Sequence, residues 1–170
     1  MVQLFTGHMT KRDATSKRDA TRTRWRIGLA IGDSATRTAQ PLTTISRSKS
    51  VASDAQVVSR IAAEQRIAEL VVGLPLHMDG SESPQAERTR DWAEAVSAAT
   101  GLAVRYRDER LTSERAERRI GGAARGRSGG PPTAAQREAY RARVDREAAA
   151  LILQDEFDDA GSDDMENKTR

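Results

Sequence analysis

Acidic residues that could bind a divalent cation occur at two distant places in the chain. The first is the motif Asp108-Glu109-Arg110-Leu111-Thr112, which follows an apolar segment at 103–106. The second is Asp145, which would share one face of a helix with Ala149 and Ile152. If these carboxylates meet, they form the hard oxygen cluster that Mg²⁺ or Mn²⁺ prefers. Two such ions can activate a water molecule and stabilise the leaving oxygen in phosphodiester hydrolysis.

Each acidic position also has a purely structural interpretation. Asp108 and Glu109 would favour the start of the following helix through its dipole. Asp145 would be satisfied by an ion pair with a nearby arginine such as Arg141, since a carboxylate turned toward a core needs a partner. The residues alone leave both interpretations open.

Other enzyme chemistries find no support in the residue types. The chain has no cysteine, which excludes thiol nucleophiles, disulfides and thiolate zinc sites and favours a reducing, cytoplasmic compartment. It contains no P-loop glycine motif, and His77 has no evident serine partner. Metal-assisted hydrolysis is the one enzyme mechanism that the residues favour.

A third candidate segment runs from Val72 to Gly80, where an apolar run ends in an Asp-Gly turn. Gly73 and Gly80 indicate a close backbone approach or a positive φ. The turn should open at the same sheet edge as Asp108 and line a substrate groove. The alternative for His77 is an ordinary surface role, which is commoner for a lone histidine.

The elements that must position these residues alternate in type along the chain. Apolar runs predict strands at 25–31, 41–45, 70–74 and 103–106. Capping residues and helical periodicity predict helices from Asp54 to about Ala62, from Pro84 to Thr100, over 113–120 and from Thr133 to about Phe157. This order predicts one α/β domain over 25–157, a mixed β-sheet flanked by helices.

Three segments are expected to lie outside this framework. Residues 1–24 have little apolar periodicity and predict a disordered basic arm, in which only Val2–Phe5 could form a marginal strand. Residues 121–132, GGAARGRSGGPP, predict a mobile basic loop. Residues 158–170 predict an acidic, disordered tail.

The charge of the chain favours a polyanionic partner. The whole chain has net charge +3, but residues 155–170 carry seven acids and two bases, so the remainder has net charge +8. The alternative is solvated surface charge with no binding role. No apolar run reaches the roughly 20 residues of a membrane helix, so we expect no membrane association and no secretion signal.

Several motifs in a fixed order together resemble the YqgF/RuvX family. The resemblance covers about residues 25–157, and no single motif carries it. The matching segments are Arg26–Asp33, Ala39–Ile45, Val71–Ser81, Gln85–Arg88, Asp108–Thr112, and Asp145 with Ala148–Leu153.

This resemblance implies a ribonuclease H-like fold, similar to that of the Holliday junction resolvases. It implies a metal-dependent endo- or exonuclease that processes the 5′ end of pre-16S rRNA during ribosome biogenesis in the bacterial cytoplasm. The implied site is an acidic triad for Mg²⁺ or Mn²⁺, to which Asp108 or Glu109 and Asp145 correspond. With few aromatic residues for base stacking, we expect substrate contacts from Arg26, Gly73, Pro75, His77, Arg88, Arg110, Thr112, Arg125 and Arg127.

The chain departs from the family pattern at its first motif. The family has Asp-x-Gly-x-x-Arg-Ile-Gly after an apolar strand, whereas Thr21 and Thr23 occupy the Asp and Gly positions here. Asp19 could replace the missing acid only if a tight turn accommodated two extra residues. Without it, the sheet would lack its first strand or fill the gap with Val2–Phe5.

Two other functions compete with the nuclease interpretation. The first is a catalytically silent RNA-binding or ribosome-assembly protein that keeps the fold, to which Thr21 points. The second is a resolvase that cleaves branched DNA, since similar folds act on four-way junctions. Only contacts to the 2′-hydroxyl would separate RNA from DNA.

Overall fold

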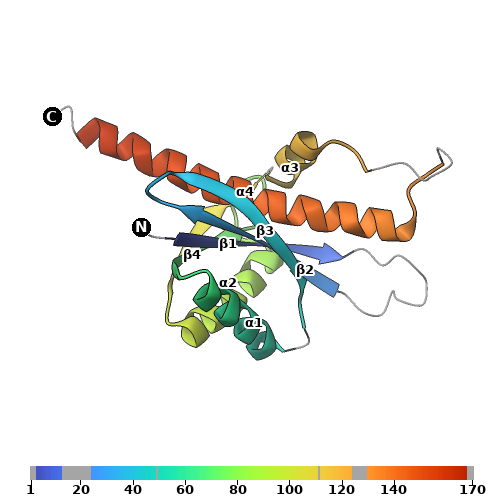
Figure 1. Cartoon of the computed structure of the whole chain (residues 1–170), viewed down its shortest axis with the longest axis horizontal. Helices are drawn as coiled ribbons and strands as arrows, with labels where there is room; N and C mark the ends of the chain where they lie inside the picture. The colour runs from blue at the N-terminus through green and yellow to red at the C-terminus, as the bar shows by residue number, and fades with distance from the viewer. Residues whose placement is uncertain (1–2, 13–23, 49, 111, 124–129, 168–170) are drawn as a thin grey trace.

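The chain forms one five-stranded mixed sheet (Figure 1). The computed structural model describes residues 3–12, 24–48, 50–110, 112–123 and 130–167, and the structural statements below concern these residues. The strand order is β3-β2-β1-β4-β5, with β1 antiparallel to β2 and parallel to β4. The strands are β1 Gln3–Arg12, β2 Arg24–Asp33, β3 Thr38–Ser46, β4 Ile67–Leu74 and β5 Ala103–Asp108.

Helices cover both faces of the sheet, as Figure 1 shows. Helices α1 (Val51–Glu64) and α2 (Pro84–Thr100) pack on one face, over a core that includes Ile27, Leu70 and Trp92. Helices α3 (Thr112–Ile120) and α4 (Ala134–Asn167) lie on the other. The predicted mixed sheet with flanking helices is confirmed. In the described part of the chain, no helix has the length and apolar character needed to span a membrane.

Local signals in the sequence account for the helix ends nearest the predicted groove. The Ser83 hydroxyl accepts a hydrogen bond from the Ala86 N–H (3.0 Å), and Pro84 occupies the first turn of α2. Gly101 ends α2 with a φ of 71°. The predicted span Pro84–Thr100 is therefore confirmed.

Two of the segments expected to be disordered contain regular structure. Residues 3–12 form β1, because β2 and β4 offer hydrogen-bonding partners on both sides and compensate for its low apolar content. Helix α4 extends to Asn167 instead of ending near Phe157. The start of this extension is held by a polar contact from Arg107 to Asp159. Residues 13–23 and 124–129 lie outside the described residues, so mobility of the 121–132 loop stays a prediction.

Helix α4 approaches the sheet closely enough to exclude side chains beneath it. A Cβ on Gly28 of β2 would lie 2.0 Å from the carbonyl oxygen of Asp145 and 2.7 Å from the amide nitrogen of Arg146. On Gly32 it would lie 2.6 Å from the Phe157 ring. Glycine at these strand positions lets the helix backbone rest on the sheet.

A buried ion pair lies at the same contact. The Arg26 Nε of β2 donates to the Asp145 Oδ2 of α4 at 2.5 Å. Arg26 is 5% exposed and Asp145 is 2% exposed, so each charge depends on the other for compensation. The pair fixes both the height and the rotation of α4 over β2.

Adding a methyl group at the closest contact should therefore weaken the fold. Gly28→Ala should lower the free energy of unfolding by about 1–3 kcal/mol or more, because the clash involves backbone atoms that cannot rotate away. Gly122→Ala is the control, since its Cβ would meet no heavy atom within 4 Å. Urea unfolding of both variants measures the difference, and equal stability of the two would contradict the close approach.

Removing one member of the buried pair should cost more than removing both. Arg26→Met leaves the Asp145 carboxylate buried without its guanidinium partner and should destabilise by about 3–5 kcal/mol. The double substitution Arg26→Met/Asp145→Leu should recover most of that loss. Chemical denaturation provides the measurement. A loss within the ~1 kcal/mol typical of a surface pair would show that the two charges are not buried together.

Candidate functional site

Asp145 lies on the sheet-facing side of α4 and is paired with an arginine. The structural interpretation anticipated this, but the partner seen is Arg26, which is 119 residues distant in sequence. The Arg26 Nη1 atom is buried without a hydrogen bond and lies 3.8 Å from the Glu138 Oε2. Arg26 therefore sits between two carboxylates of α4.

Glu109 is the second buried carboxylate and is held by the ends of two strands. Its N–H donates to the Leu74 carbonyl at 3.2 Å, and its own carbonyl accepts from the Thr112 N–H at 3.0 Å. Its side chain is packed over Gly73, where a Cβ would lie 2.5 Å from the Glu109 Oε2. Glu109 is 8% exposed. The close approach predicted at Gly73 is confirmed.

Asp108 has a different environment from its neighbour. Its side chain is exposed, and it accepts hydrogen bonds from the Arg110 N–H (2.9 Å) and the Arg110 Nε (2.6 Å). Arg110 also donates from Nη1 to the Met78 carbonyl at 3.1 Å. Of the two acids that the sequence left open, Asp108 therefore organises the turn, and Glu109 points into the protein.

Strand β1 separates the two buried carboxylates. Gly28, beneath Asp145, is paired with His8 of β1, while Val72, adjacent to Gly73, is paired with Gly7. Gly28 of β2 and Gly73 of β4 thus lie on either side of the middle of β1. They are separated by two strand spacings, or about 10 Å. Strand β1, which lies between them, has the sequence QLFTGHMTKR and contains no acid, so a carboxylate that completed an acidic cluster would have to come from another segment.

The described residues do not form a complete metal centre. Within them, no group of three or more His, Asp or Glu side chains is placed to hold a metal ion. Asp145 is already neutralised by Arg26. The donor set therefore does not fit a two-ion centre without a further carboxylate. Asp19, the predicted substitute, lies outside the described residues, and the Mg²⁺ or Mn²⁺ site stays a prediction.

The turn at the end of the third candidate segment is tightly hydrogen-bonded. The His77 N–H donates to the Ser81 carbonyl (2.9 Å) and the Gly80 N–H to the His77 carbonyl (2.8 Å), with a positive φ of 84° at Gly80 as predicted. Hydrogen bonds from the Ser81 hydroxyl and N–H lower the pKa of Asp79. His77 itself is exposed. Through Arg110, this turn is joined to the Asp108 motif.

The remaining predicted substrate contacts differ in accessibility. Arg88 is exposed on α2, and the Pro75 carbonyl accepts a hydrogen bond from the Ser83 hydroxyl at 2.5 Å. Arg26 and Thr112 are buried, so neither offers a surface to a substrate in the free chain. Arg125 and Arg127 lie outside the described residues.

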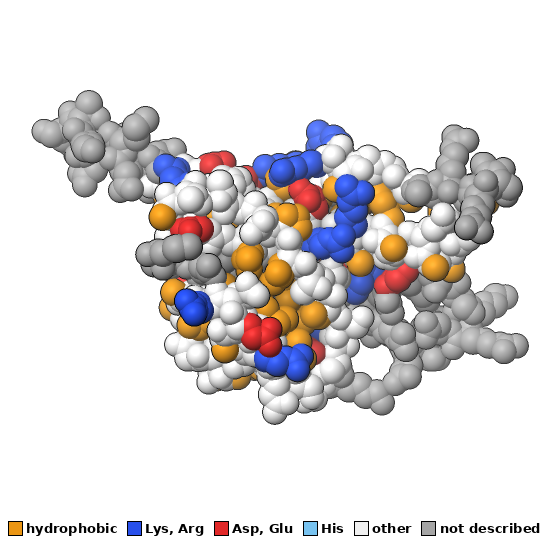
Figure 2. Space-filling view, viewed as in Figure 1, with side chains coloured by type: hydrophobic (Ala, Val, Ile, Leu, Met, Phe, Trp, Pro, Cys, Tyr) orange, Lys and Arg blue, Asp and Glu red, His pale blue; other side chains and the backbone are white. Residues whose placement is uncertain are grey.

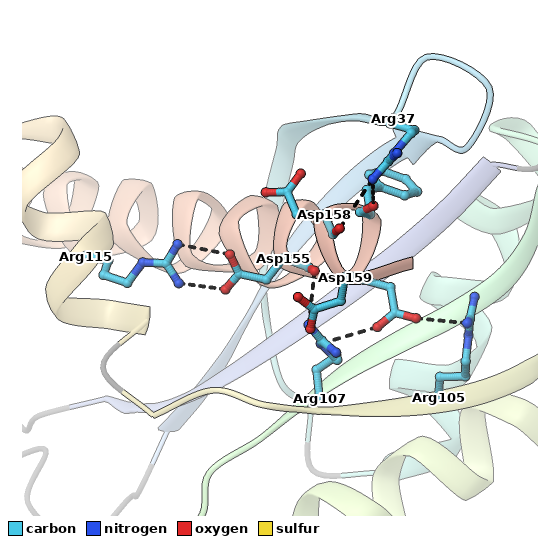
Figure 3. Close-up of polar contacts among 9 residues, drawn as sticks. Arg37, Arg105, Arg107, Arg115, Asp155, Asp158 and Asp159 are labelled. Carbon is cyan, nitrogen blue, oxygen red and sulfur yellow. Dashed lines mark hydrogen bonds and ion pairs between the residues drawn. The ribbon is translucent and has the colours of Figure 1, made fainter. Parts of the chain in front are cut away.

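Sequence reasoning missed a network of arginines around the C-terminal half of α4, shown in Figure 3. It also missed Arg26 as the partner of Asp145, for which no local signal exists. The predicted helix includes Asp155 and Glu156, but it ends near Phe157 and leaves Asp159 in the predicted disordered tail. The network joins Arg37, Arg105, Arg107 and Arg115 to Asp155, Glu156, Asp159 and backbone carbonyls of α4.

Comparisons with known proteins agree on one family. The family model described as "RuvX: Holliday junction resolvase" matches residues 24–159. A protein of Anaeromyxobacter sp. (strain K), named "Putative pre-16S rRNA nuclease", is 44% identical over 131 residues, covering 77% of this chain and 88% of its own length. A protein of the same name from Synechococcus elongatus is 45% identical over 136 residues, covering 80% of this chain and 84% of its own length.

Solved structures show a more distant likeness. T. thermophilus RuvC in complex with a Holliday junction substrate has a TM-score of 0.45 and 14% sequence identity, covering 91% of this chain and 93% of that one.

The family match spans most of the chain, and the two relatives exceed 40% identity across it. The chain therefore belongs to the RuvX family.

Proposed function

We propose that this chain is a nuclease that cleaves phosphodiester bonds at the 5′ end of pre-16S rRNA during ribosome assembly. The names of its relatives support the substrate. The observation that carries the proposal is the placement of Glu109 and Asp145, two buried carboxylates on either side of the middle of β1. Burial of two acids is costly for stability and typical of functional sites.

The proposal includes a requirement for Mg²⁺ or Mn²⁺, since oxygen donors are the ligands these ions prefer. Glu109 and Asp145 would contribute two such donors. A third would come from outside the described residues, with Asp19 as the candidate. Arg26 holds the Asp145 carboxylate in place, and Gly73 leaves the room that the Glu109 side chain occupies.

A catalytically silent RNA-binding protein is the second candidate function. It is favoured by the absence of any acid in β1 and by the neutralisation of Asp145 by Arg26. It predicts salt-sensitive RNA binding without hydrolysis. Acidic and basic side chains are interspersed on the face shown in Figure 2, so binding would depend on local arginines and not on one continuous basic surface.

Cleavage assays with matched acid variants test the proposal. Purified full-length chain should cleave an RNA spanning the 5′ end of pre-16S rRNA when Mg²⁺ or Mn²⁺ is present. Glu109→Gln and Asp145→Asn should each reduce the rate by at least about a hundredfold, because each removes an anionic oxygen from the site. Asp108→Asn, the control at the neighbouring exposed acid, should retain most of the activity.

The other outcomes identify the competing functions. RNA binding without turnover under any divalent ion would support the silent protein. Faster cleavage of a four-way DNA junction than of the RNA would support a resolvase. Because Asp145→Asn also alters the buried ion pair, circular dichroism must show that the variant is folded, and Glu109→Gln provides the independent result.

A further inference from the structure

Arginines from two elements converge on a short stretch of α4 (Figure 3). Arg115 of α3 donates to both carboxylate oxygens of Asp155, at 2.6 and 3.0 Å. Glu156 is 2.9 Å from Arg105 and 3.3 Å from Arg107, both on β5. Arg107 also reaches Asp159 at 2.5 Å. We call Arg105, Arg107 and Arg115 the arginine face.

The arginine face adjoins the candidate site. Arg107 precedes Asp108 and Glu109 at the end of β5, and Arg115 lies in the helix that follows them. A polyanion that lay along the face would therefore pass the buried Glu109 carboxylate. The Glu109 backbone is held by hydrogen bonds with Leu74 and Thr112.

The three arginines of the arginine face and the Asp159 carboxylate are partly open to solvent, whereas Glu156 is 11% exposed, and Arg105 also pairs with Glu69 at 2.5 Å. The side chains of Arg105, Arg107 and Arg115 are 49%, 27% and 44% exposed, and that of Asp159 is 69% exposed. An exposed ion pair such as Arg107–Asp159 is weak and is screened by salt. The phosphates of a nucleic acid compete well for such arginines, since their binding releases condensed counterions.

The anchoring of α4 determines which acids can be displaced. Ile152, Leu153 and Phe157 are buried against the sheet, so the helix is fixed as far as Phe157. Arg37 reinforces this point by donating to the Phe157 carbonyl. Asp158, Asp159 and Ala160 are exposed. The displaceable part of α4 therefore begins at Asp158.

We propose that the arginine face binds the phosphate backbone of RNA and that two exposed acids of α4, Asp158 and Asp159, compete with RNA for it. The identity of the polyanion as RNA rests on the proposed function. In the free chain the Asp159 carboxylate occupies Arg107, and in the complex a phosphate takes its place.

Neutralising the competing carboxylates tests the inference. Asp158→Asn/Asp159→Asn in the full chain should tighten binding of the pre-16S fragment by about fivefold at low salt. The dependence of log K on log salt should steepen by about one phosphate contact, or roughly 0.7–0.9 in slope. Adding Arg107→Gln to that variant should reverse the gain. Fluorescence anisotropy with labelled RNA measures all three.

A control with the same change in net charge, made far from the arginine face, distinguishes a local effect at the face from a general effect of net charge. Glu64→Gln/Asp91→Asn neutralises two exposed acids on α1 and α2, across the sheet from the face, and should change affinity much less. An equal gain in this control, or no gain on neutralising Asp158 and Asp159, would overturn the inference.

Heparin, a second polyanion, is measured in parallel. If heparin binding depends on the variants but no protein binds the RNA, the proposed function fails while the anion-binding face stands. If RNA is bound and cleaved but neither ligand responds to the substitutions, the inference fails and the proposed function stands.

Discussion

The site depends on the close approach of α4 to the centre of the sheet. Glycines at 28, 32 and 73 remove the side chains that would hold the helix away. The approach carries the Asp145 carboxylate out of water, which is tolerated because the Arg26 guanidinium meets it from β2. Close packing of α4 on β2 and neutralisation of the Asp145 carboxylate therefore occur at the same place. If α4 were displaced from the sheet by the width of a methyl group, both the packing and the ion pair would be lost.

The three candidate acids have different environments. Asp145 is tied to the sheet by a cation that belongs to the protein, whereas Glu109 is placed by backbone hydrogen bonds at two strand ends. Asp108, adjacent in sequence, instead faces solvent and shapes the turn with Arg110. Asp108 and Glu109 thus have different environments, because β5 ends at Asp108 and the chain turns at Glu109. A reaction at this edge of the sheet would therefore use acids that differ in burial and in their hydrogen-bonding partners.

Much of the fold could be predicted from the sequence because its signals are local. The Ser83-Pro84 start and Gly101 end of α2, and the apolar run of β4, each depend on a few adjacent residues. The interaction of Arg26 with Asp145 could not be predicted, because it joins segments 119 residues apart. The sequence indicates only a marginal strand at Val2–Phe5, whereas β1 runs over Gln3–Arg12, because its hydrogen-bonding partners are two neighbouring strands. The continuation of α4 past Phe157 could not be predicted either, because the Asp159 side chain there is held by Arg107, a residue distant in sequence.

The central position of β1 has a consequence for how the chain is synthesised and folds. Its antiparallel partner β2 follows closely, but its parallel partner β4 begins only at Ile67. The meander of β1, β2 and β3 can form early, whereas the sheet closes only after α1 and β4 have left the ribosome, a nonlocal step that slows folding. A chain initiated after residue 12 would lack the strand that joins the two halves. It would leave β3-β2 and β4-β5 as separate ribbons, each with an unpaired inner edge.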